Sequence, residues 1–277
     1  MNPQRYNIFT QCALKKSFFL FLRPEILKDL STETSIFDRT ERLLGREAME
    51  RLAVQRVILF GVGGVGGWCA ECLIRSGIQH LTLVDSDCVQ PSNLNRQVQA
   101  TTETIGELKV KALKERLLTL NPDADITAIS DIYTAETADS FHLETFDIVI
   151  DAIDSLTPKA HLILHATSLP VIFLSSMGAA LKMDPTKVQV AEFWKIQYCP
   201  LARSLRKKFK HWQKFPKSKF LCVYSPEVLQ NQCDTVSKED ITPDEFHKVQ
   251  VNGTLAHITG IFGFTLAGLA IQCLIHN

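Results

Sequence analysis

Paired cysteines are scarce in this 277-residue sequence: Cys69 and Cys72 form its one Cys-x-x-Cys pair. A closed structural zinc site needs four convergent ligands, so we expect no zinc and interpret the pair as buried cysteines of a helix. The eight cysteines are scattered and lack the spacing of a small disulfide framework. We therefore expect a reduced, cytoplasmic setting.

An excess of either charge is also absent, because 30 Lys and Arg balance 30 Asp and Glu. Net charge therefore neither favours nor excludes a nucleic acid, and the distribution of charge has to decide. Residues 203–219 hold eight Lys or Arg and no acidic residue, with Phe209, Trp212 and Phe215 interleaved. This composition suits a surface for RNA phosphates and bases, but a solvated helix whose aromatic side chains pack inward also explains it. Both interpretations stay open.

Long hydrophobic runs are rare. The run Ser17–Leu22 is ended by Arg23 and is shorter than the roughly seven to fifteen residues of a secretory signal, so we expect an N-terminal extension helix. Residues 255–275 contain no Asp, Glu, Lys or Arg and reach the about 20 residues of a membrane span. Polar side chains and three glycines interrupt them. We therefore favour a C-terminal helix buried in the protein, with a membrane anchor as the alternative.

The rest of the sequence alternates between short apolar runs and segments of helical spacing. We expect strands at residues 57–60, 81–84, 125–129, 146–150 and 171–174, and helices at 68–75, 107–120 and 158–168. The alternation predicts parallel βαβ units, and hence an α/β fold with a doubly wound, Rossmann-like, mostly parallel sheet. Residues 187–192 are expected to add an antiparallel strand, and residues 1–50 to form a helical lead-in.

A glycine-rich loop joins the first expected strand to the next helix. Its glycines include Gly61, Gly63, Gly64 and Gly66. Glycine permits a tight turn and a close approach of the backbone to phosphate, which the N–H groups of the helix N-terminus can bind. Asp85 and Asp87 follow about 20 residues later, where an acid can hold ribose hydroxyls. The loop therefore predicts a nucleotide. It fits NAD or FAD as well as ATP, so an NAD(P)-dependent oxidoreductase stays an alternative.

Three charged residues further along favour ATP. Arg96 lies after the second strand, Lys109 lies near the start of a helix, and Asp154 follows a later strand that ends at Asp151. Two cations can hold a triphosphate, and a carboxylate can hold Mg²⁺ together with phosphate oxygens. Each residue also has an ordinary interpretation, as a surface ion pair, a solvated helix residue or a helix cap. Their shared position at strand ends predicts a crevice that displaces pyrophosphate from ATP.

The sequence resembles the ubiquitin-activating-enzyme-like superfamily, which includes the ThiF-type adenylyltransferases of sulfur carriers. The residues that match the superfamily are Gly61–Gly66, Asp87, Asn93–Gln97, Lys109 and Asp154. Within it the sequence resembles the tRNA threonylcarbamoyladenosine dehydratases, through residues 42–45, 151–155, 158–159, 176–180, 184–186, 188–190, 200–203, 223–227 and 262–264. The resemblance runs from about Phe37 to the C-terminus.

The resemblance implies roles for these residues. The glycine loop would bind the phosphates of ATP, Asp87 the ribose and Asp154 the Mg²⁺, while Arg96 and Lys109 contact phosphates and Asn93 and Gln97 orient the site. Arg42 matches an arginine that a second subunit inserts into the site. A homodimer is therefore implied, with Arg42 acting across the interface.

The implied reaction is adenylation of the threonyl carboxylate of N6-threonylcarbamoyladenosine in tRNA, followed by cyclisation of the side-chain amide and release of AMP. The alternative is an adenylyltransferase that activates the C-terminal glycine of a ubiquitin-like sulfur-carrier protein. Adenylyltransferases of that kind carry two Cys-x-x-Cys pairs for zinc, so the single pair here favours the tRNA branch. A cysteine desulfurase or sulfur acceptor is left open as a further partner.

The sequence departs from the dehydratase pattern in three places. Cys199 stands where the branch has aspartate, the residues after Ser225 are acidic, and the first 36 residues have no counterpart. We therefore divide the sequence into an extension of residues 1–36 and an ATP-binding adenylating domain of residues 37–277, with a basic, loop-rich insertion at 195–250. Cys222 is expected to be a buried strand cysteine, because no activating neighbour is visible.

Overall fold

The computed structural model describes residues 35–233 and 252–276. The chain divides into two units, Met1–Asp38 and Arg39–Asn277, and the second contains the sheet and its helices. The run Ser17–Leu22 and nearly all of the expected extension 1–36 lie outside the described residues, as does the acidic part of the expected insertion. The domain boundaries drawn from the sequence stay a prediction.

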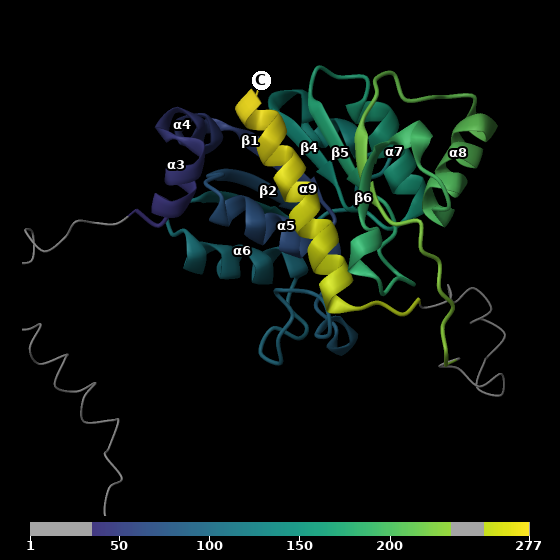
Figure 1. Ribbon diagram of the computed structural model, residues 1–277, viewed down its shortest axis with the longest axis horizontal. Helices are drawn as coiled ribbons and strands as arrows, with labels where there is room; N and C mark the ends of the chain where they lie inside the picture. Colours follow the sequence, from purple (N-terminus) through teal and green to yellow (C-terminus); the bar gives the residue numbers. More distant parts are fainter. Residues whose placement is uncertain (1–34, 234–251, 277) are drawn as a thin grey trace, which may run out of the picture. The chain divides into compact units, whose positions relative to one another are not determined.

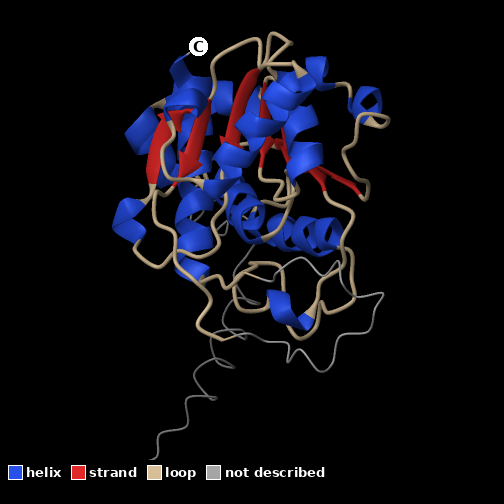
Figure 2. Ribbon diagram, turned by 90° about the vertical axis from the view of Figure 1, so that its right-hand side faces the viewer, coloured by secondary structure: helices blue, strands red, loops and turns tan. Residues whose placement is uncertain are grey.

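A seven-stranded sheet forms the centre of the second unit (Figures 1 and 2). Its strands are β1 (Arg56–Phe60), β2 (His80–Val84), β3 (Asp125–Ile129), β4 (Ile148–Asp151), β5 (Ile172–Ser176), β6 (Gln189–Glu192) and β7 (Leu221–Tyr224). Their order across the sheet is β3-β2-β1-β4-β5-β7-β6. All neighbouring strands are parallel except β6 and β7. The predicted doubly wound, mostly parallel sheet with an antiparallel addition is confirmed.

Helices surround this sheet. They are α3 (Asp38–Leu44), α4 (Arg46–Val54), α5 (Gly64–Arg75), α6 (Lys109–Leu120), α7 (Leu156–Ala166), α8 (Pro200–Trp212) and α9 (Ala256–His276). Short 3₁₀ turns occupy Pro91–Asn93, Ala138–Phe141, Leu143–Thr145, Pro185–Lys187 and Phe193–Lys195. The described part of the expected loop after Ser225, up to Cys233, contains no helix or strand.

The sheet is buried on both faces, which explains why its central strands are continuous apolar runs. In β1, Val57 and Leu59 belong to the core shared with α5, α6 and α9. Ile58 and Phe60 point the other way, into the core shared with α7 and α8. Alternate side chains of one strand thus enter two cores, and the helices are held on opposite faces of the sheet.

The topology predicts a crevice between the carboxyl ends of β1 and β4. From β1 the chain adds β2 and β3 on one side, and from β4 it adds β5 and β7 on the other. Connections that diverge from neighbouring strands leave the carboxyl ends of those strands open, and ligands of doubly wound sheets bind there. The glycine loop follows β1 at this edge, and Asp154 follows β4.

The C-terminal helix α9 packs along α5, as Figure 1 shows. Nine of its 21 residues are buried, among them Phe262, Leu266 and Leu274. It is also the one helix in the described part of the chain that is long and apolar enough to cross a membrane, and half of its most apolar stretch is buried in the protein. The expected C-terminal core helix is therefore confirmed as a packed element, buried along one side, while Phe264 on the other side is 48% exposed.

The packing of α9 on α5 depends on Gly263. A Cβ atom at this position would lie 2.5 Å from the carbonyl oxygen of Val65 and 2.8 Å from Cβ of Trp68. We expect Gly263→Ala to lower the free energy of unfolding by about 1–3 kcal/mol, because the helices must move apart. Urea denaturation followed by circular dichroism measures this change.

Gly268 on the same helix provides the matched control. A Cβ there meets no atom within 4 Å. Gly268→Ala should therefore raise the free energy of unfolding, by up to about 1 kcal/mol, because alanine favours the helix. Equal effects of the two substitutions would show that α9 does not approach α5 closely at Gly263.

Candidate active site

Two glycines shape the turn after β1. Gly61 has a φ of +84°, and a Cβ there would lie 2.8 Å from the carbonyl oxygen of Ala152. A Cβ at Gly66 would lie only 1.8 Å from the carbonyl oxygen of Gly61. The turn therefore folds tightly onto itself and onto the chain that leads from β4 to Asp154, a geometry that a side chain at either position would prevent.

The N-terminus of α5 presents this turn to the crevice. Gly63 is the N-cap residue and, as a glycine, has no side chain that could cap the helix. The first turn of the helix contains no acidic residue. The first N–H groups of a helix lack partners within the helix, and they carry the positive end of its dipole. The start of α5 is therefore suited to bind an anion such as phosphate.

Asp85 and Asp87 have different surroundings. Asp85 Oδ2 accepts the N–H of Val62 at 2.8 Å, and its Oδ1 accepts the N–H of Asp87 at 2.9 Å. Burial raises the pKa of Asp85, and these N–H groups oppose the shift. Asp85 thus braces the glycine turn. The Asp87 side chain is 67% exposed, and this is the carboxylate that can reach a ribose.

Arg96 and its neighbours lie against the start of α5. The Arg96 Cγ lies 3.4 Å from a Cβ built at Gly64, and Gln97 Nε2 lies 3.9 Å from one built at Gly63. The Arg96 guanidinium donates to the carbonyl oxygen of Ser92 and to Asn95 Oδ1, at 2.8 and 2.9 Å. These bonds hold Arg96 beside the glycine turn, and its other N–H groups can bind phosphate.

Asn93 has a structural position. It is 7% exposed, and its Oδ1 accepts the N–H of Gln90 at 3.0 Å. This bond closes the short turn that precedes Arg96. Asn93 therefore orients the loop, and the chain does not expose it to a ligand.

Lys109 begins α6 and pairs with Asp87. Its Nζ donates to Asp87 Oδ2 at 2.7 Å, and its side chain is 9% exposed. The pair brings a cation to the edge where the ribose and phosphates of a nucleotide would meet. Binding to phosphate would require Lys109 to share its three N–H groups with Asp87.

Asp151 and Asp154 are only three residues apart, but only Asp154 is exposed. Asp151 is fully buried and accepts hydrogen bonds from Lys159 Nζ at 2.8 Å, Ser175 Oγ at 2.7 Å and the N–H of Ile153 at 3.0 Å. Burial raises the pKa of Asp151, and these three donors oppose the shift by favouring the carboxylate. Asp154 is exposed beyond the strand end, with Ser155 Oγ at 3.4 Å.

Asp154 is the residue that can hold a metal. Within residues 35–233 and 252–276, no three His, Cys, Asp or Glu side chains converge as a metal site. Mg²⁺ commonly binds through one or two carboxylates together with substrate phosphates. Asp154, an exposed carboxylate at the edge that holds the glycine turn, fits this mode.

Arg42 lies in α3 and is exposed. The next helix, α4, ends two residues before the amino end of β1, and Met49 of α4 lies against Gly77 at the C-terminal end of α5. The helices α3 and α4 thus precede the amino edge of the sheet, whereas the glycine turn lies at the carboxyl edge. The structure brings together the other expected site residues but leaves Arg42 apart from them.

Several residues that support the site have no signal in the sequence. Gln99 is 2% exposed and donates from Nε2 to the carbonyl oxygen of Val62 at 2.6 Å. Trp68 Nε1 donates to the carbonyl oxygen of Arg96 at 3.1 Å. These contacts join segments that are more than 25 residues apart, so a local pattern could not reveal them.

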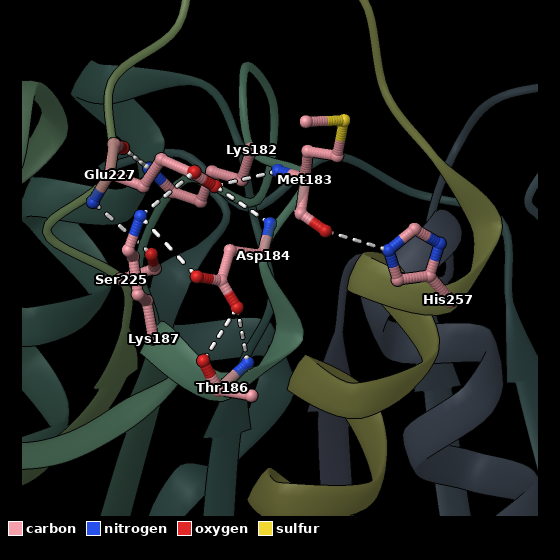
Figure 3. Close-up of polar contacts among 8 residues, drawn as sticks. All are labelled: Lys182, Met183, Asp184, Thr186, Lys187, Ser225, Glu227 and His257. Carbon is pink, nitrogen blue, oxygen red and sulfur yellow. Dashed lines mark hydrogen bonds and ion pairs between the residues drawn. The ribbon is translucent and has the colours of Figure 1, made fainter.

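A polar network lies beyond β5 and β7, at the carboxyl edge of the sheet (Figure 3). Glu227 Oε2 accepts the N–H groups of Met183 at 2.6 Å and of Asp184 at 3.0 Å, and Lys187 Nζ lies 3.4 Å from Glu227 Oε1. The Met183 N–H is the main cause that lowers the pKa of Glu227. The carboxylate thereby fastens the turn after β5 to the chain after β7.

The same network reaches the start of α9. His257 Nε2 lies 2.9 Å from the carbonyl oxygen of Met183, and Asn95 Nδ2 donates to the carbonyl oxygen of Thr254 at 3.2 Å. Lys182 Nζ donates to the carbonyl oxygen of Glu227, and burial lowers the pKa of Lys182. The entry to α9 is thus tied both to the loop of Arg96 and to the turn beyond β5.

The basic stretch 203–219 divides between the core and the surface. Phe209 is fully buried, whereas Phe215 is 52% exposed. Arg206 stabilises the fold, because its guanidinium donates to the carbonyl oxygens of Phe193 and Ile196. The inward-packing interpretation holds for Phe209, and most of the lysines remain exposed.

Two cysteines of this region are buried. Cys222 lies in β7 with no exposed surface, which confirms it as a buried strand cysteine, and burial raises its pKa. Cys199 is the N-cap residue of α8 and makes no side-chain cap hydrogen bond. An aspartate there could accept one from the helix N–H groups, so this departure from the dehydratase pattern leaves α8 without a side-chain cap.

The Asp151–Lys159 pair gives a test of what supports the crevice. Both side chains are fully buried, and Lys159 also donates to the carbonyl oxygen of Ile153 at 2.8 Å. We expect Lys159→Met to lower the free energy of unfolding by about 3–5 kcal/mol, because it leaves a buried carboxylate without its partner. Lys111→Met is the control: its pair with Glu115 is 60% exposed on both sides, so the loss should stay below about 0.5 kcal/mol. Equal, small losses in urea denaturation would contradict the role assigned to Lys159.

Comparisons with known proteins agree with this geometry. The sequence model of the ThiF family matches residues 37–277. The tRNA threonylcarbamoyladenosine dehydratase of Bacillus subtilis is 40% identical over 174 residues, which cover 63% of this chain and 68% of that protein. The protein of the same name from Escherichia coli is 34% identical over 246 residues, which cover 85% of this chain and 92% of that protein.

A solved structure matches over nearly the whole chain. It is the E. coli tRNA N6-threonylcarbamoyladenosine dehydratase in complex with AMP, with a TM-score of 0.78 and 31% identity. The match covers 89% of this chain and 96% of that one. Since the family model spans the glycine turn, the whole sheet and α9, the chain belongs to the ThiF family.

Proposed function

We propose that this protein is an ATP-dependent tRNA threonylcarbamoyladenosine dehydratase. The observation that carries the proposal is the convergence on one glycine turn of the Asp85 carboxylate, the Arg96 and Gln97 side chains and the chain that leads to Asp154. These are the parts that an adenylating site needs: a phosphate cradle, a cation and a carboxylate for a metal. The ThiF family model spans these parts, and the E. coli dehydratase compared above was solved with AMP.

The first step forms an acyl adenylate. One oxygen of the threonyl carboxylate attacks the α-phosphorus of ATP, and the bond from that phosphorus to the bridging oxygen breaks to release pyrophosphate. The N–H groups at the start of α5 and the guanidinium of Arg96 stabilise the charge that develops on the phosphates. Asp87 holds the ribose and so positions the α-phosphorus.

The second step closes the ring. The amide group of the side chain attacks the activated carbonyl carbon, loses its proton, and expels AMP. One carboxylate oxygen leaves as part of AMP, so the substrate loses the elements of water although no water molecule is released. Neither step transfers sulfur, so a cysteine desulfurase or sulfur acceptor would take part as a partner and not as a reactant.

Mg²⁺ would bind to Asp154 and to phosphate oxygens. Bound there, it would neutralise charge on the leaving pyrophosphate. We propose a cytoplasmic location, because the proposed substrates, ATP and tRNA, are present there. The seven cysteines within the described residues are free thiols, in keeping with a reducing compartment.

The proposal is tested with tRNA that carries N6-threonylcarbamoyladenosine. With ATP and Mg²⁺, the wild type should form AMP and a nucleoside lighter by one water, detected by mass spectrometry. Label placed as ¹⁸O in the substrate carboxylate should appear in AMP. We expect Asp154→Asn and Arg96→Ala each to reduce the rate by about 10²-fold or more, because charge stabilisation of the transition state is lost.

The controls separate the two candidate reactions. Glu103→Gln, a change at an exposed position beyond the crevice, should leave the rate unchanged. A carrier protein that ends in Gly-Gly replaces the tRNA in a parallel reaction. Adenylation of that protein, with no change in the tRNA nucleoside, would refute the dehydratase and support the sulfur-carrier adenylyltransferase.

We also propose a homodimer in which Arg42 of one subunit completes the site of the other. Arg42 is exposed on α3, which precedes the amino edge of its own sheet, while the crevice lies at the carboxyl edge. The neighbouring Leu43 is 83% exposed and Val54 at the end of α4 is 66% exposed, as expected of apolar side chains that a second copy would cover.

Subunit mixing tests this arrangement. Arg42→Ala and Arg96→Ala should each be nearly inactive alone, since an inserted arginine can contribute about 10³–10⁵-fold to phosphoryl transfer. After the two variants are unfolded together and refolded, mixed dimers contain one intact site, and about a quarter of wild-type activity should return. No recovery, with mixed dimers verified by native mass spectrometry, would place Arg42 in the site of its own chain.

A further inference from the structure

A groove of about 730 Å³ lies between the C-terminal half of α7 and the chain that follows α8. One wall includes His161, His165 and Ser168, and the other is formed by Trp212, Lys214, Phe215 and Lys217. Figure 1 shows α7 and α8 side by side on the β5–β7 side of the sheet. The adenylation chemistry described above uses none of these residues.

The groove is remote from the crevice. The helix α7 begins after Asp154 at the carboxyl edge and runs back toward the amino edge, where Ser168 follows its last turn. At 1.5 Å per residue, the groove residues of α7, from His161 to Ser168, lie about 10–20 Å along the helix from Asp154. The groove thus lies along the later part of α7, away from the strand end that Asp154 follows.

The two walls of the groove are fixed to each other. The helix α8 ends at Trp212, and its C-cap residue Gln213 has a φ of +51°. The N–H of Lys214 then donates to the carbonyl oxygen of Phe209 at 3.2 Å. The N–H of Lys217 donates to Thr167 Oγ1 at the end of α7, at 3.3 Å. The groove is thus formed before any ligand binds, which reduces the entropy lost on binding.

Aromatic rings offer flat surfaces to a ligand. The rings of His161 and Trp212 lie 4.6 Å apart between centroids at an angle of 43°, and Phe215 is 52% exposed. Burial lowers the pKa of His161, which favours the neutral form of this ring. Neutral, half-buried rings next to an exposed phenylalanine suit the stacking of a nucleobase.

His165 adds a polar contact. Its Nδ1 lies 2.8 Å from the hydroxyl of Tyr133, which is itself buried. Burial raises the pKa of Tyr133, so its hydroxyl stays protonated and can donate to Nδ1. In that arrangement Nε2 carries the proton, and the Nε2–H is the donor that remains for a ligand.

The charge around the groove is positive. Lys214 and Lys217 line it, and Lys208 Nζ lies 4.8 Å from the centroid of the Trp212 ring. The stretch 203–219 that supplies these lysines has no acidic residue. Glu136 is the acidic group that acts on His161, where it opposes the effects of Lys214 and Lys208. Cations beside stacking surfaces suit a polyanion with bases better than an acidic peptide.

We propose that this groove binds an unpaired nucleotide of the substrate RNA, with its base against Trp212 and Phe215 and its phosphates on Lys214 and Lys217. The inference rests on the proposed function, since it takes tRNA as the substrate. Because the groove residues of α7 lie about 10–20 Å from Asp154 along the helix, the bound nucleotide is not the one that reacts. The nucleotide bound in the groove fixes the position of the RNA on the protein while the modified adenosine enters the crevice.

Binding of labelled RNA tests the proposal. The probes are a fluorescent stem-loop RNA with an unpaired loop and a fully paired duplex RNA of the same length, each measured by anisotropy at several salt concentrations. Phe215→Ala should weaken stem-loop binding roughly tenfold and leave duplex binding almost unchanged, because only unpaired bases stack. Lys214→Glu with Lys217→Glu should weaken both RNAs and lower the salt slope by about two.

Matched controls accompany these variants. Lys111→Glu with Lys114→Glu makes the same change of charge on α6 and should not alter the slope. Phe215→Leu keeps an apolar side chain beside Trp194, whose ring lies 6.3 Å away, but removes the aromatic face. It should reproduce the loss seen with Phe215→Ala, which excludes misfolding as the cause. The affinity for ATP should be the same in all variants.

Three outcomes would overturn the proposal. If Phe215→Ala weakened stem-loop and duplex binding equally, the groove would bind RNA through charge alone, without stacking of an unpaired base. Unchanged RNA binding, together with weaker binding of a poly-glutamate peptide by the lysine variant, would assign the groove to an acidic protein. Full stem-loop affinity in every groove variant would remove it as a ligand site. A wild type that fails to convert tRNA while Phe215→Ala still loses loop binding would refute the proposed function and leave the groove in place.

Discussion

Close approach between backbones is the constraint on which the site depends. The carbonyl oxygen of Gly61 occupies the space that a side chain at position 66 would need. The carbonyl oxygen of Ala152 occupies the space that a side chain at position 61 would need. Gly263 likewise lets α9 touch the backbone of α5 at Val65. Backbone atoms make these contacts, so no change of rotamer can relieve them, and the side chains of Asp85 and Gln99 hold the turn as well. A phosphate therefore meets a site that is already formed, and little binding energy is lost in ordering the loop.

The sequence predicted most of the sheet because its strands are buried on two faces and end at glycine or aspartate. The run that begins at Val57 gave β1 within one residue, and the strand expected at 125–129 is β3 without change. The position of β7 between β5 and β6 could not be predicted in this way. That pairing joins Ser175 to Cys222, and contacts between distant segments leave no local period in a sequence.

The site shows the same limit at the level of single residues. The pattern placed Asp85, Asp87, Asp151 and Asp154 at strand ends, but it could not assign their roles. The role of each carboxylate depends on whether hydrogen-bond donors of the protein already occupy its oxygens. N–H groups occupy both oxygens of Asp85, and Lys159 and Ser175 occupy Asp151. Asp87 and Asp154 retain exposed oxygens, and so one acid of each pair supports the fold while the other is left for the ligand.

The contact between α9 and the loop of Arg96 has a consequence for the nascent chain during its synthesis. Thr259 and Arg96 are 163 residues apart in sequence, yet their atoms lie 3.5 Å from each other. At about 5–20 residues per second, the ribosome needs on the order of ten seconds to make the intervening chain. During that time the glycine loop has emerged without the helix that packs behind it. The emerging chain thus exposes apolar surface of α5, which a chaperone can cover, and the nucleotide pocket acquires its final shape only when synthesis has reached α9.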